Sequence, residues 1–258
     1  MPGHDIIVMG ASAGGFQTIQ EILSRLPGNL PASIFIAVHA SPTSSGRMPS
    51  VLARGCPLQV RHGANNEMIR HGRVYVAPPD CHLLLRPGRV WLSRGPKENG
   101  FRPAVDPLFR TAAHSYRGQV AGVILSGGLA DGTSGLMRVK ENRGIAIAQD
   151  PEEALFPNMP LSAMQNVEVD YIYRAREIAE LLIELAHAPL PKGVRGMANA
   201  HEVKPDIAEI GTAALLTGEM KGPASGFVCP ECGGALRELK DGKMIRYRCH
   251  SGHGLHVG

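Results

Sequence analysis

An apolar run that leads directly into a serine flanked by glycines limits the fold of this chain more than any other feature. Residues 6–9 form an apolar strand without polar interruption, and the turn Gly10-Ala-Ser-Ala-Gly14 follows at once. Apolar residues then recur at helical spacing over residues 16–26. An apolar strand followed by an amphipathic helix is typical of a parallel sheet that is covered on both faces.

The serine in this turn is a candidate nucleophile. Gly10-x-Ser12-x-Gly14 fits a nucleophile elbow, in which small neighbours let a strand turn sharply into a helix and expose the serine Oγ. A dinucleotide-binding turn would instead need a glycine at Ser12 and an acidic residue at the end of the next strand. Residues 34–38 form that strand, and His39 follows it. A simple tight turn remains the alternative to a nucleophile site.

The rest of the first 188 residues continues the alternation of strands and helices. Strands are expected at residues 120–125, 145–148 and 169–173, and helices at 105–116, 136–140, 161–164 and 175–186. Short strands at residues 58–61, 73–77, 82–85 and 90–92 predict an antiparallel hairpin at an edge of the sheet. We expect a doubly wound, mostly parallel α/β sheet with helices on both faces.

Three residue types that together make a catalytic triad follow strands of this sheet. Ser12, His39 and Asp131 each come after a parallel strand, and the carboxyl ends of such strands share one edge. The histidine would take the serine proton, and the aspartate would orient the imidazole. His39 could instead hydrogen-bond a loop, Asp131 could cap its own helix, and Asp106 is a rival carboxylate.

Composition excludes several classes of function. The formal net charge is only +4 and aromatic content is 5%, so neither a basic tail nor a stacking platform for nucleic acid is visible. No apolar run approaches the roughly 18 residues that span a bilayer, and no secretory signal opens the chain. We therefore expect a cytoplasmic protein that binds no nucleic acid and does not insert into membranes.

Several motifs, in order, carry a resemblance to a known family. They are residues 7–15, the strand that ends at His39, residues 72–79 with His82, residues 102–110, Asp131-Gly132, and Ala148-Gln-Asp150 with Met159-Pro160. Over about residues 5–187 the chain resembles the catalytic domain of the chemotaxis protein-glutamate methylesterases, the CheB family.

The resemblance implies an enzyme that hydrolyses glutamate γ-methyl esters on the cytoplasmic helices of chemoreceptors and releases methanol, with deamidation of glutamines as a related activity. It places the family's catalytic residues on Ser12, His39 and Asp131 and implies no cofactor for catalysis. A catalytically inactive CheB-like module that docks through its C-terminal segment is the alternative, and a generic esterase for small substrates is a more distant one.

This sequence departs from the family in two ways. Family members commonly carry an N-terminal receiver domain, whereas the first catalytic strand here begins near residue 5, so we expect no phosphorylation switch of that kind in this chain. The family turn usually reads Thr-Gly-Met-Gly-x-Asp-Gly. Here it is Ser126-Gly-Gly-Leu-Ala-Asp-Gly132, and Gly128 stands in place of the methionine.

A cysteine-rich segment ends the chain. Residues 189–226 are rich in Pro, Gly and Ala and predict a linker, with a helix near residues 207–216. Residues 227–258 contain Cys229, Cys232 and Cys249, followed by His250 and His253. The spacing predicts a small ribbon around a structural zinc held by the three cysteines and His253, because adjacent Cys249 and His250 are poorly placed to reach one ion. Docking to a partner is the expected role of this ribbon.

Overall fold

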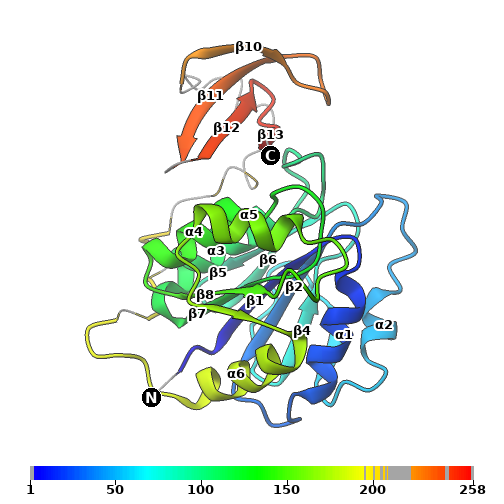
Figure 1. Ribbon diagram of the computed structural model, residues 1–258, viewed down its shortest axis with the longest axis vertical. Coiled ribbons are helices and arrows are strands. Elements are labelled where there is room, and N and C mark those ends of the chain that lie inside the picture. The colour runs from blue at the N-terminus through cyan, green and yellow to red at the C-terminus, as the bar shows by residue number, and fades with distance from the viewer. Residues whose placement is uncertain are drawn as a thin grey trace.

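The computed structural model describes residues 3–194, 196–199, 201–203, 206, 208, 222–241 and 244–256. A large α/β domain is built around one sheet, and a small antiparallel sheet at the C-terminus lies against one end of it (Figure 1). The expected helix near residues 207–216 falls almost wholly outside the described residues.

The main sheet has seven strands, and all of its neighbouring strands are parallel. Its spatial order is β3-β4-β2-β1-β7-β8-β9. The strands are β1 Ile6–Ala11, β2 Ser33–Val38, β3 Gln59–His62, β4 Arg73–Val76, β7 Val120–Ile124, β8 Ile145–Gln149 and β9 Tyr171–Tyr173. From β1 the chain runs to β2, then to the edge strand β3 and back to β4, whereas from β7 it winds outward in the other direction through β8 to β9. The switch point, where α/β proteins bind ligands, therefore lies between β1 and β7.

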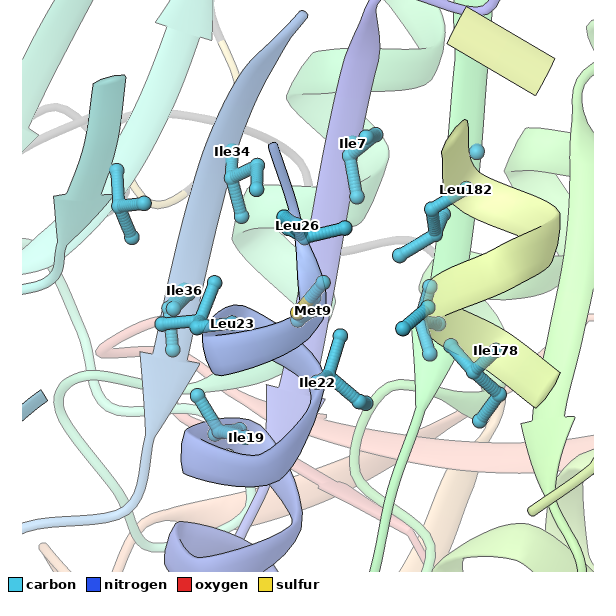
Figure 2. Close-up of a cluster of buried hydrophobic side chains, with 14 of the residues drawn as sticks. Ile7, Met9, Ile19, Ile22, Leu23, Leu26, Ile34, Ile36, Ile178 and Leu182 are labelled. Carbon is cyan, nitrogen blue, oxygen red and sulfur yellow. The ribbon is translucent and has the colours of Figure 1, made fainter. Parts of the chain in front are cut away.

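Helices cover both faces of this sheet. They are α1 Gly15–Arg25, α2 Met48–Leu52, α3 Val105–Tyr116, α4 Thr133–Glu141, α5 Asn158–Asn166 and α6 Ala175–His187, with a 3₁₀ turn η1 at Arg117–Gln119. On one face, α1 and α6 pack on strand residues such as Ile7 and Met9 (Figure 2). Ile6 and Val8 belong to the cluster with α3, α4 and α5 on the other face. Burial on both faces explains why the strands are apolar throughout.

The expected hairpin is present but lies elsewhere. β5 His82–Arg86 and β6 Arg89–Ser93 form a two-stranded sheet of their own, which packs against α3 instead of extending the main sheet. Leu83, Leu85 and Val90 are buried in the α3 cluster. The edge position is taken by β3, which pairs in parallel with β4. A short strand alone does not specify which edge it joins, so this arrangement depends on tertiary packing.

The C-terminal sheet has four antiparallel strands, β10 Ala224–Val228, β11 Ala235–Asp241, β12 Met244–Cys249 and β13 Gly254–His256, in sequential order. Its apolar core is small and includes Leu236 and two cysteines. Part of the expected linker packs on the large domain, where Asp206 pairs with the buried Arg110. No described helix is both long enough and apolar enough to cross a bilayer.

Candidate active site

Ser12 lies one residue beyond β1, at the switch point of the sheet. Its backbone N–H donates to Ser126 O at 3.0 Å, which joins the turn after β1 to the turn after β7. A Cβ at Gly15 would lie 2.5 Å from Ala11 Cβ and 2.8 Å from Ser126 O, so only glycine lets α1 begin this close to the sheet. Gly14 has a φ of 75°, which also favours glycine. The small residues of the turn are thus required by the packing.

His39 brings its imidazole between the serine and the aspartate. Its Nδ1 lies 3.0 Å from Ser12 Oγ, and its Nε2 lies 2.6 Å from Asp131 Oδ2. Asp131 Oδ2 can only accept when ionised, so Nε2–H donates to it and Nδ1 is left free to accept the serine proton. The two ring nitrogens have the opposite assignment in chymotrypsin-type triads. The structure therefore brings together the three residues singled out from the sequence.

Asp131 is buried and accepts hydrogen bonds from three further donors. They are Asn99 Nδ2 at 2.8 Å and the backbone N–H groups of Val105 and Asp106 at 2.7 and 3.2 Å. Val105 and Asp106 open α3, so the carboxylate caps that helix, where the helix dipole favours negative charge. It makes no side-chain cap on its own helix α4, whose N-cap is Gly132. A buried carboxylate held in this way is well placed to orient an imidazole.

Asp106, the rival carboxylate, serves a different site. Its Oδ1 accepts from the Gly135 N–H at 2.6 Å, in the first turn of α4. Its Oδ2 lies 2.7 Å from Nε2 of His256 in the C-terminal sheet. Burial alone would raise the pKa of Asp106, but the hydrogen bond and charge of His256, together with the charges of Arg246 and Arg110, hold that pKa well below its usual range. Asp106 therefore acts in packing and domain contact.

Two residues that the sequence interpretation missed complete the surroundings of His39 and Asp131. Asn99 bonds Asp131, and Phe101 stacks on the His39 ring with centroids 3.7 Å apart and planes 6° apart. Both lie in a turn in which Glu98 and Phe101 exchange backbone hydrogen bonds. Asn99 and Gly100 have φ values of 53° and 80°, as in a type I′ turn, which favours Asn-Gly. The Asn-Gly pair was a visible signal for the turn, but not for its place beside His39.

A cavity of about 340 Å³ opens onto the serine and histidine. Its wall includes Ser12, His39, Ser41, Lys97, Phe101 and Arg102. A wider groove of about 700 Å³ runs between α5 and the C-terminal sheet, where its lining includes Leu129, Leu161, Ile245 and Tyr247. The smaller cavity provides room for an ester group at Ser12. The C-terminal sheet forms one wall of the wider groove.

The two glycines before Leu129 have opposite surroundings. A Cβ at Gly127 would lie 2.9 Å from Ser12 Cβ and 2.1 Å from Sδ of the buried Met159. A Cβ at Gly128 would meet no heavy atom within 4 Å. Gly128, at which this sequence departs from the family turn, therefore borders open space, whereas Gly127 is packed tightly against Ser12.

Three cysteines and one histidine gather at one end of the C-terminal sheet. The ligand atoms of Cys229, Cys232, Cys249 and His253 all lie within 4.8 Å of one another. The sulfurs of Cys232 and Cys249 are 3.6 Å apart. His253 Nδ1 lies 3.6 Å from Cys229 Sγ and 3.5 Å from Cys249 Sγ. His253 belongs to this cluster, and the exposed His250 does not.

Two arginines of the C-terminal sheet face the large domain. Arg246 Nη2 donates to Glu98 Oε2 at 3.1 Å, and Arg248 Nη2 lies 3.8 Å from the same oxygen. Arg110 of α3 makes two further hydrogen bonds to this carboxylate. Burial alone would raise the pKa of Glu98, but the charges of Arg110, Arg248 and Arg246 hold that pKa well below its usual range. These two C-terminal arginines thus serve an internal ion-pair cluster.

The doubly wound sheet and the hydrogen-bonded serine, histidine and aspartate at its switch point have the arrangement of an α/β hydrolytic enzyme. Comparison with known proteins supports this class. The profile of the CheB methylesterase family matches residues 7–182. The chain therefore belongs to this family of carboxylic ester hydrolases.

Individual relatives agree with the family profile. A Leptospira interrogans protein is 39% identical over 183 residues, which cover 70% of this chain and 95% of the relative, and its name assigns methylesterase and glutaminase activity provisionally. A Thermotoga maritima protein-glutamate methylesterase/protein-glutamine glutaminase is 37% identical over 184 residues, which cover 70% of this chain and 54% of the relative. The crystal structure of the Thermotoga maritima CheB methylesterase catalytic domain superposes with a TM-score of 0.67 at 36% identity, covering 70% of this chain and 98% of that chain. The chain thus matches about half the length of the Thermotoga maritima enzyme and almost all of its catalytic domain.

Proposed function

We propose that this chain hydrolyses glutamate γ-methyl esters in proteins and releases methanol, with methylated chemoreceptor cytoplasmic helices as the substrate and deamidation of glutamines as a related activity. The observation that carries the proposal is the chain of two hydrogen bonds from Ser12 through His39 to Asp131, of 3.0 and 2.6 Å. Family membership supplies the substrate class, because relatives are named for methylesterase and glutaminase activity.

The geometry supports acyl transfer in two steps. Ser12 Oγ attacks the ester carbonyl while its proton passes to His39 Nδ1, and Asp131 stabilises the imidazolium that forms. When the tetrahedral intermediate collapses, the bond to the methoxy oxygen breaks and the proton on Nδ1 leaves with methanol. Water, activated by the same nitrogen, then hydrolyses the glutamyl–serine ester. This step frees Ser12 and leaves a glutamate side-chain carboxylate on the substrate protein. No metal or cofactor takes part in this sequence.

The oxyanion of the tetrahedral intermediate needs hydrogen-bond donors near Ser12. Helix α1 begins three residues after Ser12, at Gly15, whose N–H donates to Ser12 O at 3.1 Å. The other N–H groups of the first turn of a helix have no partner within it. The positive end of the helix dipole adds to their effect on a developing negative charge. We assign oxyanion stabilisation to the turn between Ser12 and α1.

Methanol release from a methylated receptor fragment tests the proposal. We expect the full-length chain to release methanol and Ser12→Ala to lower kcat by at least about a thousandfold, because the nucleophile is lost. Ser41→Ala is the matched control, since Ser41 lines the same cavity but its hydroxyl bonds only Thr43 among the described residues. No release by wild type, or equal release by Ser12→Ala, contradicts the proposal.

A serine-directed fluorophosphonate separates the alternatives. A catalytically inactive docking module would leave Ser12 unlabelled, whereas a general esterase would turn over nitrophenyl esters far faster than methylated receptor. Labelling that requires both Ser12 and His39, together with preference for the receptor, supports the methylesterase.

We also propose that Cys229, Cys232, Cys249 and His253 hold one structural zinc ion. In a tetrahedral site with Zn–S bonds of about 2.3 Å, ligand sulfurs lie about 3.8 Å apart and a sulfur and a nitrogen about 3.5 Å apart. The separations of 3.5–3.6 Å fit these values. Four protein ligands leave no open position, which favours a structural role. The apolar core of this sheet is small, so metal binding and folding should be coupled.

Native mass spectrometry tests the zinc site. We expect one zinc per chain in the wild type and in His250→Ala, and none in His253→Ala. An apo mass for the wild type in zinc-containing buffer, or retention of zinc by His253→Ala with loss by His250→Ala, contradicts this assignment.

A further inference from the structure

The C-terminal sheet contacts the turn that stacks on the catalytic histidine. The backbone N–H of Asn99 donates to Gly254 O at 2.7 Å, and the Gly254 N–H donates to Lys97 O at 3.1 Å. The backbone N–H of His256 donates to the side chain of Asn99 at 3.0 Å. Strand β13 thus binds residues 97–99 through backbone hydrogen bonds and one side-chain bond, although more than 150 residues of sequence separate the two segments.

The same turn contacts two members of the triad. Asn99 Nδ2 donates to Asp131 Oδ1 at 2.8 Å, and Phe101 stacks on His39. Phe101 also lines the cavity at Ser12, together with Lys97 and Gly100. Any displacement of this turn would remove a hydrogen bond from the buried Asp131 carboxylate and uncover one face of the imidazole.

Side chains reinforce this contact from the C-terminal side. His256 Nε2 lies 2.7 Å from Asp106 Oδ2, and both side chains are almost fully buried. Arg246 bonds Glu98, the first residue of the turn. On the far side of the turn, Arg102 is held within the large domain by Asp80. The C-terminal sheet therefore adds anchors on the Glu98 side of the turn, where Arg110 also binds, and the large domain alone holds the Arg102 side.

The proposed metal site is close to this contact in sequence. His253 directly precedes Gly254, the residue that bonds both Lys97 and Asn99. Cys249 N also donates to His253 O at 3.1 Å, which fixes the backbone at the start of β13. Because a small metal-bound sheet loses its structure without the metal, loss of the ion would release β13 and with it the anchors on the turn.

We propose that the C-terminal domain is an intramolecular clamp for the catalytic site, in which the metal-bound strand β13 holds the Asn99-Gly100 turn so that Asn99 supports Asp131 and Phe101 covers His39. Asn99 and His256 are positioning residues in this arrangement, because His256 acts through Asp106 and Asn99. The inference rests on the proposed hydrolase chemistry at Ser12. It predicts that metal occupancy of the C-terminal domain controls the reactivity of a serine in another domain.

The experiment uses the zinc-loaded full-length chain and compares His256→Ala, His256→Gln and Arg237→Ala. Arg237→Ala is the control because this arginine belongs to the same sheet but its side chain bonds only Gly222 O among the described residues. The rate of Ser12 labelling by a fluorophosphonate and the kcat for methanol release are measured before and after treatment with a zinc chelator. Hydrogen–deuterium exchange reports the protection of residues 97–101 in each sample.

We expect His256→Ala to lower both rates about tenfold or more, as small misplacements of catalytic groups do. His256→Gln should recover most of the loss, because its side-chain amide can donate to Asp106. The chelator should lower the wild-type rates at least as much as His256→Ala does, because His256→Ala keeps the backbone hydrogen bonds of β13 to the turn. The two losses should not multiply, since both changes act on the same turn. Exchange at Asn99 should rise in both cases, and Arg237→Ala should match wild type.

Other outcomes separate this inference from the proposed function. Unchanged rates in His256→Ala, no recovery in His256→Gln, or losses that multiply on chelation overturn the clamp. Unchanged exchange of residues 97–101 after zinc removal also overturns it, even if the chain has no esterase activity. A third outcome is a wild type whose exchange increases on chelation but which shows neither labelling nor methanol release. That outcome contradicts the proposed function. It also overturns the inference as stated, because the clamp would then be a structural contact without a catalytic role.

Discussion

At the scale of single residues, the site depends on tight packing around Ser12 as much as on its polar side chains. Ser12 and His39 directly follow β1 and β2, and their side chains are hydrogen-bonded. Small residues around Ser12 let the chain turn sharply at this point. Gly127 lies against the serine on the β7 side, and Gly128 borders open space. Adjacent positions in one turn should therefore differ sharply in their tolerance of a side chain.

Gly127→Ala and Gly128→Ala form a matched pair that tests this contrast. We expect Gly127→Ala to lower kcat about a hundredfold, because its methyl group would push against Ser12 Cβ and displace the nucleophile. Gly128→Ala should keep kcat within about twofold of wild type, since its methyl group meets nothing. Steady-state kinetics with methylated receptor gives the comparison, and similar losses in both variants would refute the packing argument.

At the scale of elements, the first turns of helices α3 and α4 donate hydrogen bonds to the carboxylates of Asp131 and Asp106, which fixes these side chains. Asp131 caps α3, while Asp106 of α3 accepts from the first turn of α4, so each helix start is fixed by the loop or helix beside it. On the opposite face, α1 carries the turn that contains Ser12 and packs against α6 (Figure 2). The position of the serine thus depends on a core far from the cavity.

Helix α6 allows the core contribution to be separated from surface effects. Leu182→Ala should lower the free energy of unfolding by about 2–5 kcal/mol, because it leaves a cavity in the cluster shared with α1. Glu180→Ala, on the exposed side of the same helix, should leave stability unchanged within error, since its ion pair with Arg176 is screened by solvent. Urea denaturation measures both, and equal effects would argue against α6 as a core helix.

At the scale of the whole molecule, a buried ion-pair cluster joins the C-terminal sheet to the large domain. Glu98 accepts from Arg110 of the large domain and from Arg246 of the C-terminal sheet. Removing one partner of such a cluster leaves a buried charge without compensation, which typically costs about 3–5 kcal/mol. The position of the C-terminal sheet (Figure 1) should therefore be sensitive to the charge of one carboxylate.

The pH dependence of this contact has a definite sign. The folded-state pKa of Glu98 lies well below the value of about 4.3 for an unfolded glutamate. Its contribution to stability is thus fully present above that unfolded value and is lost as the pH falls below it toward the folded-state pKa. We expect limited proteolysis to release the C-terminal sheet when the pH is lowered below about 4.

A variant at neutral pH separates this effect from acid release of metal. Glu98→Gln mimics the protonated state, so it should increase cleavage between the domains at pH 7 while zinc remains bound. Proteolysis unchanged in Glu98→Gln, or an interface that weakens when the pH is raised from 5 to 8, would contradict the assignment of this cluster.

The sequence by itself determined the parallel sheet, the three residues at its carboxyl edge and the cysteine–histidine set at the C-terminus. Periodicity and chain order suffice for these features, because parallel strands end at one edge and metal knuckles are local in sequence. Only the tertiary structure decided the location of the hairpin, the orientation of the His39 ring, and the roles of Asn99, Phe101 and His256. All of these features depend on contacts between segments far apart in the chain, and the geometry of such contacts is set only when those segments pack together.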